Sequence, residues 1–244
     1  KFDLCLVSNK ESENFLRILG AKNIKNHGNI KFSNIASNSN NKLDIIFLNR
    51  IKGRKIWCAA STHPTEEILC ATSHLTIKEK YKNILTIIIP RHIDRVKKIN
   101  EELLKLNLKI LLSSQLAQID SKTDIILVDS YGEALKFYDI SKYVFLGKSL
   151  VKSLIKDGGQ NPIEPARLGC KIFHGPYISN FFETYEFFKK LDITKEINNS
   201  NELSISLVEE FKEDKPKNQF IAAKIENYGQ NILNNVIVEL KKYI

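Results

Sequence analysis

Residues 84–90 have the sequence Ile-Leu-Thr-Ile-Ile-Ile-Pro, and Arg91 and His92 follow directly. The run is apolar and does not alternate with polar residues, which is typical of a strand covered on both faces in a parallel sheet. Similar short runs recur along the chain. The strands predicted in this way are residues 2–8, 55–60, 84–90, 109–112, 125–128, 143–146, 171–174 and the less apolar run 193–197.

Longer stretches with helical periodicity separate these runs. The predicted helices are residues 11–19, 65–80, 94–106, 132–138, 162–168, 180–191, 201–211 and 220–243. The repeated strand–helix order predicts an α/β fold with a Rossmann-like doubly wound parallel sheet, followed by C-terminal helices. Ligands of such sheets bind at the carboxyl ends of the strands, so polar residues at those ends are the first candidates for a site.

A polar stretch, residues 33–41, is rich in Asn and Ser and lacks periodicity, which is typical of a linker. The expected parts are residues 1–27 (a first strand–helix unit or the end of another domain), 28–42 (a hinge), 43–214 (the main α/β domain) and 215–244 (a C-terminal helix). The chain contains no methionine, so we expect it to be a fragment of a longer protein.

The composition is that of an ordinary globular protein, with 43% hydrophobic and 27% charged residues. No apolar run reaches the roughly 20 residues that a membrane-spanning helix needs, and the N-terminus lacks a signal-peptide pattern. We therefore expect a soluble, cytoplasmic protein. Trp57 lies inside a predicted strand and is expected in the core.

The net charge of +9 raises the possibility of a nucleic-acid or membrane partner. The lysines are spread thinly in pairs, without the interleaved aromatics of nucleic-acid-binding clusters, so no nucleic-acid partner is expected. The alternative of a basic face that approaches an anionic bilayer is left open. The four cysteines lack paired spacing, and we expect reduced thiols rather than disulfides or a zinc site.

The segment most suited to a ligand follows the predicted strand 143–146. Gly147-Lys148-Ser149-Leu150 is succeeded by Gly158-Gly159-Gln160-Asn161-Pro162-Ile163-Glu164. The glycine pair lets the backbone pass close to a ligand, Asn161 can cap the next helix, and the N–H groups of that helix can receive a phosphate. Glu164 could accept hydrogen bonds from ribose hydroxyls. The alternative is a capped helix in which Glu164 only complements the helix dipole.

A second segment, residues 59–67, passes from a strand into a helix that is expected to begin at Pro64. Ser61 and His63 would line the carboxyl end of the strand. An N-cap with an acidic first turn explains Thr62 and Glu66 without any ligand. It does not explain His63, which is a poor cap and a candidate for function.

Two further strand ends carry polar residues. Arg91 follows the strand 84–90 and suits a phosphate or carboxylate, although it could also be a surface residue. His92 is its neighbour. Ser130, Gly132 and Glu133 follow the strand 125–128 and could meet a base or a ribose.

The sequence lacks the common nucleotide-binding fingerprints. There is no P-loop and no Gly-x-Gly-x-x-Gly motif after the first strand. His63 and Glu67 stand four residues apart without a His-Glu-x-x-His frame, so no metal site is expected. The convergence of four polar strand ends on one crevice predicts a nucleotide-binding α/β domain.

In order and spacing, these segments resemble the C-terminal half of the Kdo (3-deoxy-D-manno-octulosonic acid) transferases. Family motifs such as Ala-Ser-Thr-His-x-x-Glu-Glu, Pro-Arg-His and Gly-Gly-x-Asn-Pro-x-Glu-Pro-Ala recur here. The matching stretches are residues 28–32, 60–67, 90–92, 128–133, 158–166 and 175–181. The resemblance covers the chain to about residue 191. Two departures are Lys148, where the family often has Gly or Ser, and a longer loop between Gly147 and Gly158.

The resemblance implies the C-terminal domain of a GT-B glycosyltransferase, with residues 43–214 binding the nucleotide sugar CMP-Kdo. Arg91 and the helix end at Asn161, after Gly158 and Gly159, would bind the phosphate. Glu164 would hold the ribose hydroxyls.

The same resemblance places Ser130, Gly132 and Glu133 near the cytosine. Lys31, Ser61 and His63 would face the sugar or the phosphate, and His92 counts among the donor-binding residues. No cofactor or metal is implied, because helix N-termini and cations stabilise the leaving phosphate in such enzymes.

The implied acceptor is a lipid A precursor at the cytoplasmic face of the inner membrane, whose anionic surface is an implied partner. The general base is expected in an N-terminal domain outside this chain. The chain by itself would therefore bind CMP without transferring sugar. The alternatives are another GT-B enzyme, such as a sugar-nucleotide epimerase, and a basic nucleic-acid-binding module.

Overall fold

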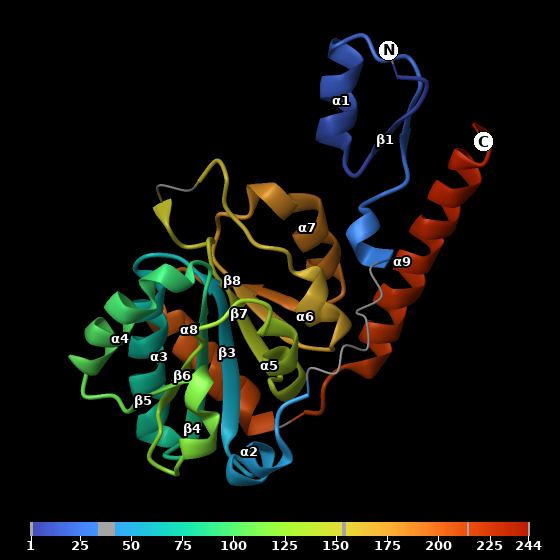
Figure 1. Cartoon of the computed structure of the whole chain (residues 1–244). Coiled ribbons are helices and arrows are strands. Elements are labelled where there is room, and N and C mark those ends of the chain that lie inside the picture. The colour runs from blue at the N-terminus through green and yellow to red at the C-terminus, as the bar shows by residue number, and fades with distance from the viewer. Residues whose placement is uncertain (1, 34–41, 153–154, 214, 244) are drawn as a thin grey trace. The chain divides into compact units, whose positions relative to one another are not determined.

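The computed structural model describes residues 2–33, 42–152, 155–213 and 215–243 (Figure 1). The chain divides into two compact units. We call residues 39–218 the sheet unit, and residues 1–38 together with 219–244 the terminal unit.

The sheet unit contains a seven-stranded sheet in the order β5-β6-β4-β3-β7-β8-β9. Every neighbouring pair is parallel. The strands are β3 (Lys55–Thr62), β4 (Ile84–Pro90), β5 (Ile110–Leu112), β6 (Ile125–Leu127), β7 (Tyr143–Leu146), β8 (Lys171–His174) and β9 (Thr194–Glu196). The strand order reverses at β3, which has β4 on one side and β7 on the other. Crevices at such reversal points are the usual ligand sites of α/β sheets.

Helices cover both faces of the sheet (Figure 1). Their bounds are α2 (Ile45–Arg50), α3 (Glu66–Lys80), α4 (Val96–Leu104), α5 (Ala134–Ile140), α6 (Ile163–Arg167), α7 (Phe182–Lys190) and α8 (Ser200–Glu213). Buried side chains of α3, α4 and α8 share one hydrophobic cluster with the sheet, while α5 contacts β3 and α6. The predicted α/β fold with a Rossmann-like parallel sheet is confirmed.

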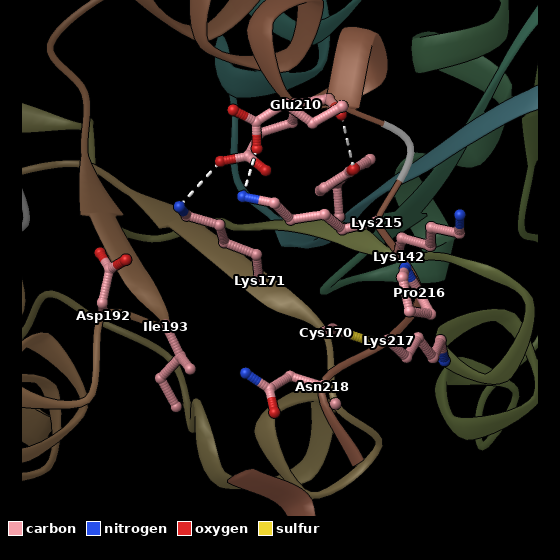
Figure 2. A pocket seen from close by; sticks show the side chains of 13 residues that line it. Lys142, Cys170, Lys171, Asp192, Ile193, Glu210, Lys215, Pro216, Lys217 and Asn218 are labelled. Carbon is pink, nitrogen blue, oxygen red and sulfur yellow. Dashed lines mark hydrogen bonds and ion pairs between the residues drawn. The ribbon is translucent and has the colours of Figure 1, made fainter. Parts of the chain in front are cut away.

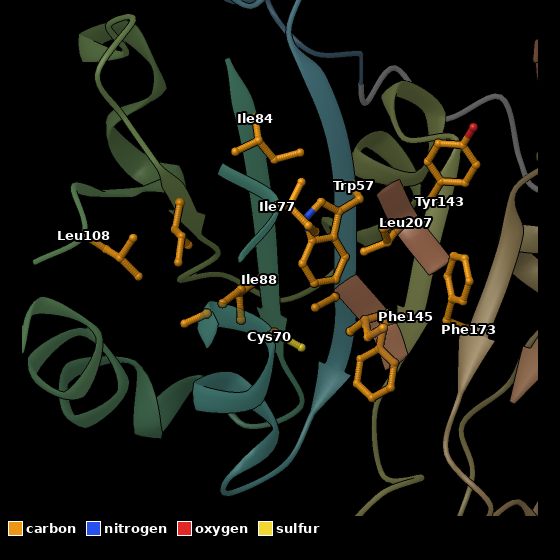
Figure 3. Packing of buried hydrophobic residues seen from close by; sticks show 14 of the residues in the cluster. Trp57, Cys70, Ile77, Ile84, Ile88, Leu108, Tyr143, Phe145, Phe173 and Leu207 are labelled. Carbon is orange, nitrogen blue, oxygen red and sulfur yellow. The ribbon is translucent and has the colours of Figure 1, made fainter. Parts of the chain in front are cut away.

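The core forms around Trp57 on β3, whose side chain is 0% exposed. Figure 3 shows this indole among Cys70, Ile77, Ile88 and Leu207, which come from α3, β4 and α8. Burying a side chain of this size stabilises the fold by about 2–3 kcal/mol. The expectation that Trp57 belongs to the core is confirmed.

The terminal unit consists of β1 (Cys5–Val7), α1 (Lys10–Ile18), β2 (Ile24–Asn26), the 3₁₀ turn η1 (Ile30–Ser33) and α9 (Gln219–Leu240). Strands β1 and β2 pair in parallel. Helix α9 packs against η1, with the rings of Phe32 and Tyr228 5.1 Å apart, edge to face. Gly229 makes this approach possible, because a Cβ there would lie 1.9 Å from the Phe32 carbonyl oxygen.

The central strands 84–90, 143–146 and 171–174 have the predicted bounds. Strand β2 and helix α2 were not predicted, since three and six residues are too few for a periodicity to emerge. The predicted first strand, 2–8, is longer than β1. Part of the predicted hinge, residues 34–41, lies outside the described residues.

A buried polar cluster joins α3 to the amino end of β6. Asp124 accepts hydrogen bonds from Lys78 Nζ and, at 3.0 Å, from the Lys109 N–H. His74 Nε2 lies 3.4 Å from Asp124 Oδ1, and His74 Nδ1 lies 2.8 Å from Thr86 Oγ1. Burial alone would raise the pKa of Asp124, but hydrogen bonds from His74, the Lys109 N–H and Lys78 together hold it well below its usual range. Burial lowers the pKa of His74 despite the attraction of Asp124.

We expect Asp124→Asn to destabilise the sheet unit by about 3 kcal/mol, because it leaves buried donors without their charged partner. Urea unfolding followed by Trp57 fluorescence measures this loss. The folded-state pKa of Asp124 lies below its unfolded value of about 3.9, so its contribution is present above that pH and lost as the pH falls further. The wild-type protein should therefore lose more stability than the variant below pH 4. Equal losses in the two proteins would contradict the assignment.

Candidate functional site

The carboxyl ends of the parallel strands share one edge of the sheet, which we call the carboxyl edge. Eleven of the twelve predicted site residues lie there: Ser61, His63, Arg91, His92, Ser130, Gly132, Glu133, Gly158, Gly159, Asn161 and Glu164. They occupy the end of β3 and the loops after β3, β4, β6 and β7, together with the start of α6. Lys31 belongs instead to η1 of the terminal unit. Its predicted role at the donor therefore stays a prediction.

Strained backbone marks this edge. The register between β3 and β4 shifts between Ala60 and Thr62, and Ser61 has a left-handed φ of +54°. Thr65 and Lys148 are also left-handed, with φ of +82° and +57°. Each such residue costs about 1–2 kcal/mol, and strain of this kind gathers at functional sites.

The expected N-cap in residues 59–67 is wrong. The bulge at Ser61 carries β3 on to Thr62, whose side chain is fully buried, and α3 begins only at Glu66. The residue before α3, Thr65, makes no side-chain cap.

Glu66 does lie in the first turn of α3, as expected, but its carboxylate also has partners outside the helix. Its side chain is 1% exposed, and its carboxylate accepts the backbone N–H groups of His63, Lys148, Ser149 and Leu150 at 2.8–3.0 Å. Burial raises the pKa of Glu66, while these four hydrogen bonds act in the opposite direction. The carboxylate thus ties the loop after β3 to the loop after β7. The contact with the loop after β7 could not be predicted, since Lys148, Ser149 and Leu150 are more than 80 residues from Glu66 in the sequence.

The loops of this edge lie against one another with little room for side chains. A Cβ on Gly147 would lie 2.6 Å from the Ser61 carbonyl oxygen, and one on Gly158 would lie 2.4 Å from the Tyr177 carbonyl oxygen. Gly159 has a φ of +90°, and its Cβ would lie 2.9 Å from Ile178 Cα. The glycine pair was expected to bring the backbone near a ligand. Its immediate neighbours are instead protein backbone, so close loop packing already requires both glycines.

Positive charge gathers around His63. Its ring lies 5.7 Å from that of His92, edge to face. Burial lowers the pKa of His63 to about 4, and the positive charges of His92, Lys148, Arg95 and Arg91 lower it further. We call Arg91, His92 and Lys148, together with the neutral His63, the cationic cluster.

Arg95 is distinguished from the cationic cluster by its partner. It donates two hydrogen bonds, of 2.9 and 3.1 Å, to the Glu67 carboxylate, which is 1% exposed. Within the described ranges, the side chains of Arg91 and Lys148 have no ion-pair partner, and His63 Nε2 is buried without a hydrogen bond. An uncompensated cluster of this kind suits an anionic ligand.

The start of α6 partly matches the prediction. Asn161 Oδ1 accepts the Ile163 N–H at 3.1 Å, but α6 begins at Ile163, so the N-cap residue is Pro162, which makes no side-chain cap. Glu164 is exposed to solvent, which leaves its carboxylate accessible. The helix has only five residues, so its dipole contributes less than the expected longer helix would.

The loop after β6 is fixed by a residue that was not predicted. Asp129 accepts hydrogen bonds from Ser113 Oγ at 2.7 Å and from the N–H and Oγ of Ser114 at 3.0 and 2.6 Å. Ser130 and Gly132 are exposed beyond it, and Gly132 has a φ of +82°. Glu133 forms an ion pair with Lys136 at 2.6 Å.

A pocket of about 380 Å³ lies at the opposite, amino edge of the sheet (Figure 2). Its lysines already have partners: Lys171 pairs with Glu210 at 2.8 Å, Lys215 with Glu213, and Lys217 donates to the Tyr138 carbonyl oxygen. It contains none of the predicted site residues. We therefore place the candidate site at the carboxyl edge.

Two features are absent from the described residues. No group of three or more His, Cys, Asp or Glu side chains there is arranged to hold a metal ion. Nor does any described helix have the length and apolar character that crossing a membrane requires.

No protein-family model matches the chain. By structure, it resembles the C-terminal CMP-Kdo binding domain of WaaA from Acinetobacter baumannii, with a TM-score of 0.60 and 22% identity over 78% of this chain and 99% of that one. A UDP-N-acetylglucosamine 2-epimerase gives a TM-score of 0.54 at 11% identity, over 98% of this chain and 58% of the epimerase. At these identities the likeness concerns the fold, which is that of a Rossmann-like C-terminal domain of the GT-B class.

By sequence, the chain is 33% identical to a 3-deoxy-D-manno-octulosonic acid transferase of Haemophilus influenzae over 174 residues, or 71% of this chain and 40% of the relative. It is 28% identical to the enzyme of that name from Aquifex aeolicus, over 86% of this chain and 54% of the relative. The chain thus spans about half the length of the curated relatives it matches. It belongs to the family of the 3-deoxy-D-manno-octulosonic acid transferases.

We expect Gly159→Ala to destabilise the sheet unit by about 3 kcal/mol, because the new methyl group meets the Ile178 backbone at a strained φ. Gly53→Ala is the matched control, since Gly53 has a φ of +80° but nothing within 4 Å of the added Cβ. The control should lose only about 1 kcal/mol. Urea unfolding of both variants measures the difference, and equal losses would show that packing does not explain Gly159.

The His63 imidazole should titrate near pH 4 in the ligand-free protein, as measured by NMR and assigned with His63→Gln. An unfolded histidine titrates near pH 6.5, so the folded pKa is the lower one. The contribution of His63 to stability is therefore present above about pH 6.5 and is lost as the pH falls toward 4. A titration near 6.5 would show that His63 is neither buried nor beside cations.

Proposed function

We propose that this chain is the donor-binding part of a 3-deoxy-D-manno-octulosonic acid transferase, and that the carboxyl edge of the sheet unit binds CMP-Kdo. The observation that carries the proposal is the cationic cluster at the reversal point of a Rossmann-like sheet, where Arg91 and Lys148 have no ion-pair partner among the described residues. CMP-Kdo brings a phosphate and a carboxylate, and a cluster of two histidines, an arginine and a lysine suits both anions.

The phosphate is assigned to Arg91 and Lys148, with the Asn161 turn as a secondary contact. Cations at this position stabilise the negative charge that grows on the phosphate as the sugar leaves. Because these cations can stabilise that charge without a bound metal, we still predict that the reaction needs no metal ion. His63 is neutral at pH 7 and can donate or accept one hydrogen bond to the sugar or the phosphate.

The remaining predicted residues are assigned to the nucleoside. The exposed Glu164 carboxylate is suited to the two ribose hydroxyls, because an ionised carboxylate accepts from both. Ser130, Gly132 and Glu133 would contact the cytosine from the loop that Asp129 holds in place. Gly158 and Gly159 contribute by letting their loop pack closely beside this site.

The other parts of the reaction are inferred from the family alone. They are a lipid A precursor as acceptor, the cytoplasmic face of the inner membrane as location, and a general base outside these 244 residues. That this chain by itself binds CMP without transferring sugar is likewise a prediction.

A UDP-sugar epimerase is the second candidate, and a fold likeness to such an enzyme favours it. Its donor would carry a diphosphate. The relatives by sequence are 3-deoxy-D-manno-octulosonic acid transferases, and the similar WaaA domain binds CMP-Kdo, which favours a CMP-linked donor instead. The comparison of CMP with UDP separates the two.

Calorimetric titration of the chain should show saturable binding of CMP that is at least tenfold tighter than that of UDP. Arg91→Ala and Glu164→Ala should each weaken CMP binding about tenfold or more, as expected when a charge-assisted hydrogen bond is lost. Glu101→Ala, an exposed glutamate on α4, serves as the control and should bind as the wild type does. Tighter binding of UDP would favour an epimerase-like donor, and equal binding by all variants would contradict the assigned site.

A further inference from the structure

The Glu66 carboxylate connects two loops of the carboxyl edge, the loop after β3 and the loop after β7. Although Glu66 is the first residue of α3, its oxygens point to loops outside that helix. Oε2 accepts the N–H of His63 at 2.9 Å and of Lys148 at 2.8 Å. Because one oxygen accepts both, the backbones of these two residues of the cationic cluster are held next to each other.

The second oxygen fixes the rest of the loop after β7. Oε1 accepts the N–H groups of Ser149 and Leu150, both at 3.0 Å. Successive N–H groups that converge in this way form a concavity that commonly binds anions. Here the bound anion is a side chain of the protein, so these N–H groups are not available to a phosphate.

The conformation of Lys148 depends on this arrangement. Its φ of +57° is unfavourable for a residue with a side chain, and the hydrogen bond from its N–H to Glu66 compensates for the strain. Gly147 allows the approach, since a Cβ there would lie 2.7 Å from Glu66 Oε2. The Lys148 carbonyl oxygen then accepts the Gly159 N–H at 2.7 Å, which extends the support to the loop before α6.

We propose that Glu66 is a positioning residue that assembles the cationic cluster by holding Lys148 beside His63. The identity of the anion that the cluster binds, CMP-Kdo, rests on the proposed function. The positioning itself rests on the contacts of Glu66 alone. A positioning role differs from a purely structural one, because it predicts a change in the cluster even where the fold is kept.

The test uses Glu66→Gln and an NMR titration of the His63 ring. A glutamine keeps one acceptor oxygen but turns an NH₂ group toward two N–H donors, so two of the four hydrogen bonds are lost. Lys148 then moves away from His63, and the pKa of His63 should rise above its wild-type value of about 4, because one of the cations that lower it is displaced. Deleting a negative charge without any movement would lower this pKa, so a rise reports the displacement.

Binding of CMP by calorimetry is the second readout. Glu66→Gln should weaken CMP binding at least tenfold. Asp124→Asn is the matched control, since Asp124 is also a buried carboxylate beside α3 but lies at the amino edge. That variant should lose stability yet bind CMP within twofold of the wild type.

Lys148→Ala keeps the test decisive if Glu66→Gln fails to fold. It removes the positioned charge but keeps the backbone N–H, and it should also raise the pKa of His63 and weaken CMP binding. An unchanged His63 pKa in Glu66→Gln would overturn the positioning role. If only Lys148→Ala folds, an unchanged His63 pKa in that variant would overturn it. Failure of the wild type to bind CMP would instead overturn the proposed function, and the His63 titration would still decide the role of Glu66.

Discussion

One buried carboxylate organises the carboxyl edge of this protein. Glu66 accepts four backbone N–H groups from two loops that are far apart in the sequence. Four donors can keep a carboxylate ionised in a buried position, because together they replace the water that it has lost. Lys148 and Ser149 in turn support two further positions of this edge, because Lys148 accepts the Gly159 N–H before α6 and Ser149 accepts the Gly175 N–H after β8. The candidate site is therefore a set of loops joined by backbone contacts, and its geometry depends on this one side chain.

The charges at the carboxyl edge indicate which kind of ligand these loops can bind. Arg95 is neutralised by Glu67, whereas Arg91 and Lys148 have no ion-pair partner in the described part of the chain. His63 is kept neutral between them. In the pocket at the amino edge, by contrast, Lys171 and Lys215 pair with glutamates and Lys217 donates to a carbonyl group. The contrast between the two edges supports the assignment of the donor to the carboxyl edge.

Much of the fold could be predicted because the central strands are continuous apolar runs. Strands β4, β7 and β8 have the predicted bounds, and the polar residues that follow β4, such as Arg91, lie at one edge as parallel pairing requires. The bulge at Ser61 could not be predicted, since it depends on the backbone of β4. The hydrogen bonds of Glu66 and Asp129, and the packing of α9 on η1, could not be predicted either. Such contacts join distant residues and leave no periodic signal.

The most direct test of the central claim is a crystal structure of the chain with bound CMP. The account predicts that the phosphate contacts Arg91 and Lys148, that Glu164 accepts from the ribose hydroxyls, and that Glu66 keeps its hydrogen bonds to His63 and Lys148. A nucleotide bound in the pocket at the amino edge, or a phosphate held by the N–H groups of residues 148–150 with Glu66 displaced, would contradict it.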